Sequence, residues 1–222
     1  GTNPVSIAVR KNVAYVVNGG SLSIQGYTFD NQGLTPILGS GRSLSAGAST
    51  PSQIAFAPNG VLVVTERGSN TLDSFTLDGD LRAQAPRQIA AVGNVPFGFD
   101  FANGFAIVSD ANAGAGNSAA TAYSVAEDGT LAAVSGPVPT GQAAACWLVT
   151  SKDGRYAFTA NAGSGSISTL TVGADGALAD VHTTVVLAGQ HIVDEAVSGN
   201  GRFLYVLADG TGQVFGFRIE DD

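Results

Sequence analysis

The sequence predicts an all-β chain made of five copies of one repeat of about 47 residues, and three observations support this. With 30 glycines, 44% hydrophobic and 13% charged residues, the composition excludes a disordered chain and a helical bundle. Apolar residues alternate along each repeat, as they do in strands. Four short antiparallel strands per repeat are typical of a β-propeller blade, whereas a β-sandwich has no reason to repeat one motif. That motif recurs at spacings of 48, 48, 47 and 47 residues: Tyr27-Thr28-Phe29, Phe75-Thr76-Leu77, Tyr123-Ser124-Val125, Leu170-Thr171-Val172 and Phe217-Arg218-Ile219.

Turns at two places in each repeat supply the hairpins that a blade needs. Their Asn-Gly and Asp-Gly pairs provide the positive φ of tight turns. One turn, closed by leucine, follows the recurring motif at 30–34, 78–81, 128–131 and 175–178, and another precedes it at 10–12, 58–60, 102–104, 152–154 and 199–201. We therefore expect a single domain over 1–222, with blades at about 1–47, 48–93, 94–141, 142–189 and 190–222.

The strands can then be placed in order. The first inner strand is expected at Pro4–Val9, and the fourth repeat predicts strands at 145–151, 155–159, 166–172 and, outermost, 181–186. The fifth repeat stops where its outer strand should begin, so the expected count is five times three plus four, or 19 strands. Either five blades close a ring with one of them incomplete, or they belong to a larger ring. An open segment would expose unpaired strand edges.

Charge and cysteine content exclude several classes of partner. Lys plus Arg is 10 and Asp plus Glu is 18, so the net charge is −8, which disfavours nucleic acid and anionic membranes. One cysteine excludes a disulfide framework and a cysteine-based zinc site. Asp78-Gly79-Asp80 lacks the spacing of a calcium loop. We expect no metal and no cofactor.

The compartment stays undecided between secreted, periplasmic and cytoplasmic. No apolar run approaches the roughly 20 residues of a membrane helix, and no signal peptide is visible. The chain begins Gly1-Thr2 and contains no methionine, so we do not expect residue 1 to be the native start.

Two stretches resemble a known family. They are the run from Pro51 through Asn59-Gly60 to Glu66, and the run from Asp153 through Asn161 into Gly165-Ser166-Ile167-Ser168. They resemble the YVTN-type repeats of the lactonase-type seven-bladed β-propellers, which include 6-phosphogluconolactonase and carboxymuconate cyclase. The resemblance implies seven blades, of which this chain covers about five. It specifies blade architecture rather than chemistry, so no catalytic residue is carried over from it.

The candidate site lies where the loops gather. Loops that enter the inner strand and loops that join the second strand to the third share one end of each blade, the entry end, around the mouth of the central channel. Of the ten basic residues, only Arg67 is expected at this end. The acidic residues expected there are Glu66, Asp110, Asp194, Glu195 and Asp209, so the formal charge is 1 − 5 = −4. A negative charge disfavours a phosphorylated ligand, unless the missing blades supply the cations.

The catalytic candidates are His191, Glu195, Glu66, Arg67 and Asp110. The run 190–195 replaces a neutral entry turn by an imidazole and two carboxylates, which could supply a general base for water. The alternative is a solvated acidic loop. Glu66 and Arg67 are either a base with an oxyanion clamp or an ordinary surface pair.

The expected substrate-binding residues are Trp147, Phe97, Asn161, Asp194 and Asp209. Trp147 and Phe97 both follow an entry turn into an inner strand, where they line a pocket or pack in the core. The neighbouring Cys146 is expected to be a small buried hydrophobe, because His182 should lie on a distant outer strand.

The function that these residues favour is a lactonase-like hydrolase acting on a small neutral lactone at the channel mouth. The alternative is a non-catalytic propeller that binds protein or carbohydrate through its entry-end loops. The expected partner is a small-molecule ligand or a protein. The missing blades would come from another chain or from residues outside this one.

Overall fold

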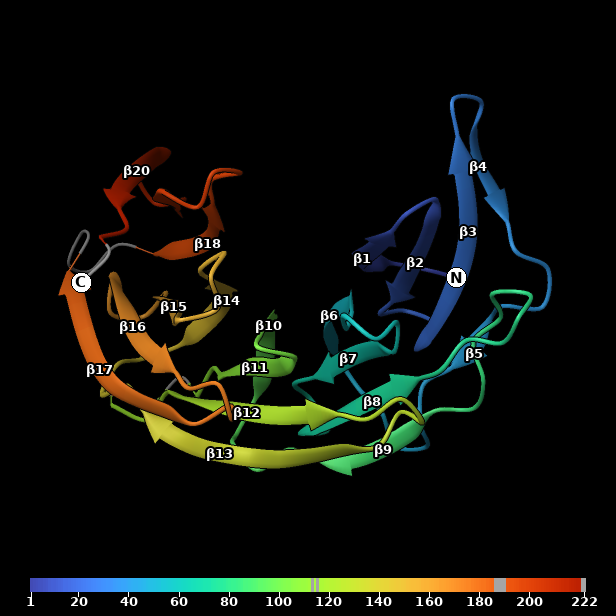
Figure 1. The fold of residues 1–222 in the computed structure, drawn as a ribbon, viewed down its shortest axis with the longest axis horizontal. Helices are drawn as coiled ribbons and strands as arrows, with labels where there is room; N and C mark the ends of the chain where they lie inside the picture. Colours follow the sequence, from blue (N-terminus) through green and yellow to red (C-terminus); the bar gives the residue numbers. More distant parts are fainter. Residues whose placement is uncertain (113, 115, 186–190, 221–222) are drawn as a thin grey trace. The chain divides into compact units, whose positions relative to one another are not determined.

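The computed structural model describes residues 1–112, 114, 116–185 and 191–220, and these residues form strands and turns without a helix (Figure 1). The strands make five antiparallel sheets in which sequence neighbours pair, as expected for propeller blades. Blade 1 contains β1 (Pro4–Arg10), β2 (Val13–Asn18), β3 (Ser23–Asp30), β4 (Gly33–Pro36) and β5 (Arg42–Ser43). Blade 2 contains β6 (Pro51–Phe56), β7 (Leu62–Glu66), β8 (Thr71–Phe75) and β9 (Arg87–Ala90).

The remaining three blades follow the same plan. Blade 3 contains β10 (Pro96–Ala102), β11 (Phe105–Asp110), β12 (Ala119–Val125) and β13 (Leu131–Pro139). Blade 4 contains β14 (Ala145–Thr150), β15 (Tyr156–Asn161), β16 (Ser166–Val172) and β17 (Leu178–Val185). Blade 5 contains β18 (Ile192–Val197), β19 (Phe203–Ala208) and β20 (Gln213–Arg218) within the described residues.

The all-β prediction is confirmed, and some details differ. The described residues form 20 strands rather than 19, because the outer strand of blade 1 is divided into β4 and β5, which both pair with β3. The outer strand of blade 4 begins at Leu178, three residues earlier than expected, and the predicted end at Val186 lies outside the described residues.

The contacts group into two compact units. Unit 1 comprises residues 1–91 and 125–132, and therefore blades 1 and 2. Unit 2 comprises residues 92–124 and 133–222, and therefore most of blade 3 together with blades 4 and 5. That the chain forms a single domain remains a prediction.

The second strand of each blade carries much of the core. All five residues of β7 are buried, as are five of the six in β11 and β15, because these valine- and alanine-rich strands are covered on both faces. Tyr15, Ile54 and Phe75 anchor the apolar cluster of unit 1. In unit 2, one cluster joins blades 3 and 4 and another joins blades 4 and 5. Each fully buried Leu, Ile or Phe contributes ~1.5–3 kcal/mol.

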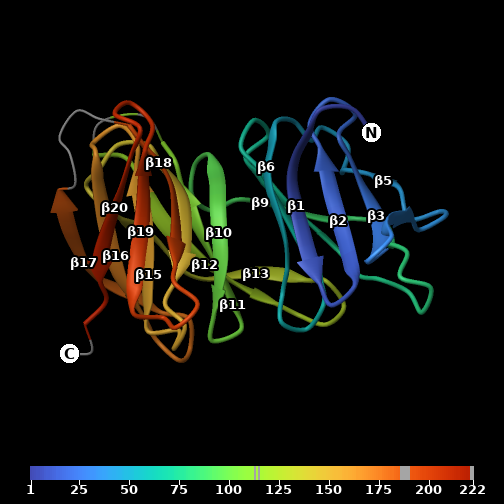
Figure 2. The same ribbon diagram turned by 90° about the horizontal axis from the view of Figure 1, so that it is seen from above.

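The first strands are the inner strands, as predicted. β1 packs against β6 in unit 1, while β14 packs between β10 and β18 in unit 2. Figure 2 shows β1 running antiparallel beside β2. Every first strand shifts register within its first few residues, at Pro4/Ser6, Pro51/Gln53, Pro96/Phe99, Ala145/Trp147 and Ile192/Asp194. A bulge at the entry end is thus a repeated feature, and it sets which side chains face the core.

Candidate functional site

One register position recurs at the entry end of every blade. It is the last residue of the second strand, which pairs with the first residue of the inner strand. Four of its five occupants are polar and buried, at 5% exposure or less. Glu66, Asp110 and Asn161, which the sequence places in separate loops, therefore occupy the same position in their blades. The occupants are Asn18, Glu66, Asp110, Asn161 and Ala208.

Asn161 shows what this position does in blade 4. Its amide nitrogen donates to the hydroxyls of Ser166, at 3.1 Å, and Ser168, at 2.9 Å, both on β16. The side chain is fully buried. Asn161 therefore closes the β15–β16 hairpin, and its amide is already engaged by the blade rather than turned to a substrate.

Asp110 occupies the same position in blade 3. Its Oδ2 accepts a hydrogen bond of 2.6 Å from the Thr121 hydroxyl, and its Oδ1 has no partner among the described residues. A side chain at Gly93 would collide with this carboxyl, so a glycine is needed there. Burial raises the pKa of Asp110 to about 6, and the Thr121 hydrogen bond opposes this rise. With 1% exposure, Asp110 is closed to a ligand in this structure.

Glu66 and Arg67 lie at the entry end of blade 2, in unit 1. The Glu66 side chain is fully buried, with Oε2 accepting from the hydroxyls of Ser69 at 3.1 Å and Thr71 at 3.4 Å. Burial, followed by the charge of the neighbouring Asp73, raises the pKa of Glu66 to about 8. Arg67 is exposed. The structure therefore places the expected base inside the blade and the expected oxyanion clamp outside it.

Glu195 requires a correction. The sequence places it in an entry loop, but it lies within β18, opposite Val206. Its counterparts in the other inner strands are all apolar: Ile7, Ile54, Phe99 and Leu148. The bulge between Ile192 and Asp194 changes which face the following residue occupies, so the carboxyl points into the core.

The buried Glu195 carboxyl joins blade 5 to blade 4. Its Oε1 accepts the backbone N–H of Ala160 at 3.1 Å, while Oε2 finds no partner in the part of the chain that the structure describes. Burial raises the pKa of Glu195 well above its usual range, and the nearby charge of Asp194 adds to this. A buried carboxyl that accepts a backbone N–H from the neighbouring blade is a packing element, so Glu195 is a poor candidate for a base that touches substrate.

The exposed ionisable groups at the entry end of unit 2 are His191, Asp194 and Asp209. The segments that carry His191 and Asp209 meet, because the backbone N–H of Asp209 donates to the His191 carbonyl at 3.2 Å. Asp194, a strand residue rather than the expected loop residue, accepts the Glu195 N–H at 2.8 Å. Gln190, the first residue of the expected loop, lies outside the described residues.

Phe97 and Trp147 lie on the inner strands β10 and β14, as predicted. Both are half-buried, and their rings meet edge to face with centroids 5.3 Å apart. The close approach depends on Gly98, where a Cβ would lie 2.7 Å from the Cys146 carbonyl oxygen. Trp147 also packs against the apolar cluster between blades 4 and 5. The pair thus combines a packing role with a partly open aromatic surface.

Burial changes the charge expected from sequence. Of the five acids counted at the entry end, Glu66, Asp110 and Glu195 are buried. In unit 2 the exposed acids Asp194 and Asp209 remain, whereas the basic residues of that unit all lie at turns or strand ends of the opposite end: Lys152, Arg155, Arg202 and Arg218. The entry end of unit 2 is therefore acidic through two exposed carboxylates.

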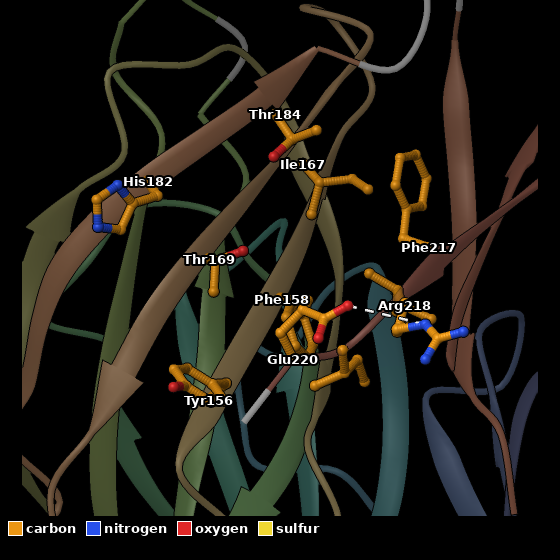
Figure 3. A pocket seen from close by; sticks show the side chains of 11 residues that line it. Tyr156, Phe158, Ile167, Thr169, His182, Thr184, Phe217, Arg218 and Glu220 are labelled. Atoms are coloured by element: carbon orange, nitrogen blue, oxygen red, sulfur yellow. Dashed lines mark ion pairs between the residues drawn. The ribbon is translucent and has the colours of Figure 1, made fainter. Parts of the chain in front are cut away.

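Two cavities in unit 2 lie away from these residues. One of about 300 Å³ is lined by Tyr156, Phe158, His182 and Phe217, among others, and contains the Arg218–Glu220 ion pair at 3.7 Å (Figure 3). A second, of about 370 Å³, lies at the opposite end beside Lys152 and Arg202. His182 is on the outer strand β17, as predicted.

The described residues contain no group of three or more His, Cys, Asp or Glu side chains placed to hold a metal ion. Nor do they include a helix long and apolar enough to cross a membrane.

Comparisons with known proteins place the fold. Residues 105–222, more than half of the chain, match the family model described as lactonase, seven-bladed β-propeller. The blades and this match together define a propeller of the lactonase type. The chain belongs to the lactonase seven-bladed β-propeller family. No curated protein matches the chain.

Solved structures agree on the fold. A protein from Lactobacillus plantarum superposes with a TM-score of 0.81 at 19% identity, over 99% of this chain and 68% of that one. A periplasmic gluconolactonase from Pseudomonas aeruginosa gives 0.76 at 19%, over 99% and 69%. A putative 6-phosphogluconolactonase from Bacteroides fragilis gives 0.76 at 17%, over 99% and 67%. The chain therefore spans about two thirds of the length of these structures.

The sequence interpretation missed the equivalence of the buried polar position, although a signal for it was present. The tetrapeptides ending at that position are Tyr15-Val16-Val17-Asn18, Val63-Val64-Thr65-Glu66, Ile107-Val108-Ser109-Asp110 and Phe158-Thr159-Ala160-Asn161. Aligning them places Glu66 and Asp110 where two other blades have asparagine. That alignment would have indicated a buried polar role for both.

Proposed function

We propose that the chain hydrolyses a small neutral lactone at the entry end of unit 2. Membership of the lactonase family supports the reaction class. The observation that carries the assignment of the site is that His191, Asp194 and Asp209 are exposed there, while Asp110 and Glu195 are buried. His191 is then the group able to reach a bound ligand as a base.

In this proposal His191 takes a proton from water as the oxygen attacks the lactone carbonyl carbon. The ring C–O bond breaks, and the proton is returned to the alcohol oxygen, so one water and one lactone give one hydroxy acid. Phe97 and Trp147 offer an apolar wall for the ring. Arg67 lies in unit 1 and takes no part in this proposal.

The preference for a neutral substrate follows from charge. Asp194 and Asp209 are exposed at this end, and the described basic residues of unit 2 lie at the other. Two like charges 4 Å apart repel by about 1 kcal/mol in water, and more in a sheltered site. A phosphate group would meet this repulsion without a cation from the same unit to offset it.

The test compares an aldonolactone with its phosphorylated form on one preparation, with and without chelator. We expect turnover of the unphosphorylated lactone, and a loss of about 10²–10⁴-fold in His191→Asn, the range for removing a general base. His182→Asn is the matched control, because His182 is the other histidine of the chain and lies on an outer strand. A tenfold preference for the phosphorylated lactone, or equal effects of both variants, would contradict the proposal.

The alternative is a non-catalytic propeller that binds carbohydrate or protein at the same end. The burial of Glu66, Asp110 and Glu195 favours it, because three of the proposed catalytic groups are engaged in packing. Trp147 is the one tryptophan of the chain, so its fluorescence reports binding nearby. Saturable quenching by a sugar, together with no turnover of a lactone panel, would support this alternative.

A further inference from the structure

We propose that Glu66 and Asp73, two buried carboxyl groups of blade 2, share one proton, which Glu66 donates to Asp73. This hydrogen bond would close the β7–β8 hairpin and make the stability of unit 1 dependent on pH. The role replaces the catalytic one that the sequence suggests for Glu66.

The first argument is the equivalence between blades. Glu66 pairs with Thr71 on β8, as Asn161 pairs with Ser166 on β16. Two residues further along lie Asp73 and Ser168. In blade 4 the Asn161 amide donates to Ser168 at 2.9 Å. Blade 2 therefore has the Glu66 carboxyl where blade 4 has the donor Asn161. It has the Asp73 carboxyl where blade 4 has the acceptor Ser168.

The second argument is the hydrogen bonding of Asp73. Its Oδ2 accepts the Ser45 backbone N–H at 2.7 Å, and its Oδ1 accepts the Ser45 hydroxyl at 2.6 Å. Both oxygens thus receive donors, as suits the ionised form. Of the two carboxyls, Asp73 is therefore the one whose oxygens both already act as acceptors.

The third argument concerns Glu66 itself. Its side chain is fully buried, and Oε1 has no hydrogen-bond donor, whereas Oε2 accepts from Ser69 and Thr71. An ionised Oε1 would be a buried charge without compensation, which is costly. Asp73 pairs with Val64, two residues before Glu66, so the two carboxyl groups are diagonal neighbours on one face of the β7–β8 pair. A proton on Glu66 therefore has an acceptor beside it.

The charged surroundings fit a neutral Glu66. Asp73 on β8 is the charged group that acts on it, and Ser69 and Thr71 contribute hydroxyls. Arg67, the next residue, is exposed, and Arg87 on β9 is exposed and pairs with Asp128 at 3.4 Å. Burial and the Asp73 charge together raise the pKa of Glu66 to about 8.

The direct test is a carboxyl titration by NMR. The chain contains four glutamates, so labelling glutamate with carbon-13 yields four side-chain carboxyl signals: Glu66, Glu127, Glu195 and Glu220. We expect one signal with a midpoint near pH 8 that disappears in Glu66→Gln. Asp73→Asn should lower that midpoint by at least one pH unit, since it removes the neighbouring charge.

The control is Asp80→Asn, an exposed acid in the β8–β9 connection of the same blade, which should leave the midpoint unchanged. If Asp73→Asn does not fold, Ser45→Ala tests the same pair by removing one donor to Asp73, and should move the midpoint. A Glu66 signal that titrates below pH 5 would overturn the proposal. So would a midpoint that falls on adding calcium, because a cation rather than a proton would then join the pair.

Discussion

Phe97 and Trp147 show how far a single aromatic pair can serve two purposes. Their edge-to-face contact, with ring planes at 87°, joins the inner strands β10 and β14 at the entry end. Each ring is only half-buried. The contact therefore stabilises blades 3 and 4 while leaving an aromatic surface open to a ligand.

A double-mutant cycle should measure this contact. We expect Phe97→Leu and Trp147→Leu to show a coupling free energy of about 0.5–1.5 kcal/mol, the usual value for an aromatic pair. Trp147→Ala alone should cost less than the ~3–5 kcal/mol of a fully buried tryptophan. Denaturant unfolding measures both quantities, and coupling indistinguishable from zero would mean that the rings do not pack in solution.

At the scale of the strand, the entry-end bulge decides the direction of each side chain. In blade 5 it turns Glu195 to the core and leaves Asp194 exposed. In blade 3 it allows Gly98 to lie against the backbone of β14, where a Cβ would be 2.8 Å from the Trp147 Cα. A side chain there has no room unless one strand moves.

Gly98→Ala should therefore destabilise unit 2 by about 1–3 kcal/mol, the cost of inserting a methyl group into a packed contact. It should also weaken the Phe97–Trp147 contact and change the fluorescence of the single tryptophan. Gly199→Ala is the control, because a Cβ at that turn meets no atom within 4 Å and its φ is not positive. Equal effects of the two substitutions would rule out strand approach as the cause.

Across the whole chain, buried acids should make stability fall as the pH rises. Glu66, Asp110 and Glu195 all have folded-state pKa values above their usual range. The folded chain therefore binds more protons than the unfolded chain between about pH 4 and pH 8. The stability these groups provide is complete below their unfolded pKa and is lost as the pH rises through the folded one.

Exposed acids act in the opposite sense at lower pH. Hydrogen bonding by Ser151 and Arg155 lowers the pKa of Asp153 to about 2. Hydrogen bonds also lower the pKa values of Asp78 and Asp128. Their contribution is lost as the pH falls below about 4. We therefore expect thermal unfolding to show maximal stability near pH 4–5. The combined variant Glu66→Gln, Asp110→Asn and Glu195→Gln should flatten the fall between pH 5 and 8, and an unchanged slope would contradict this account.

The sequence by itself determined the blades. Alternating apolar residues and Asn-Gly or Asp-Gly turns are local, so they place the strands of blade 4 to within a few residues and put Phe97 and Trp147 on inner strands. The same local signals identify the family to which the chain belongs. They also predict the outer position of His182.

Only the tertiary structure decided which candidate acids can meet a ligand. Glu195 is three residues after the buried Ile192, so simple alternation would put it on the opposite face of β18. The bulge turns it inward instead, and blade 4 then covers it and donates the Ala160 N–H. Glu66 likewise lies opposite Thr71 and diagonal to Asp73, because the register of β7 and β8 pairs Asp73 with Val64. Burial depends on what a neighbouring strand or blade places over a side chain, and that contact is not encoded in the spacing of one repeat.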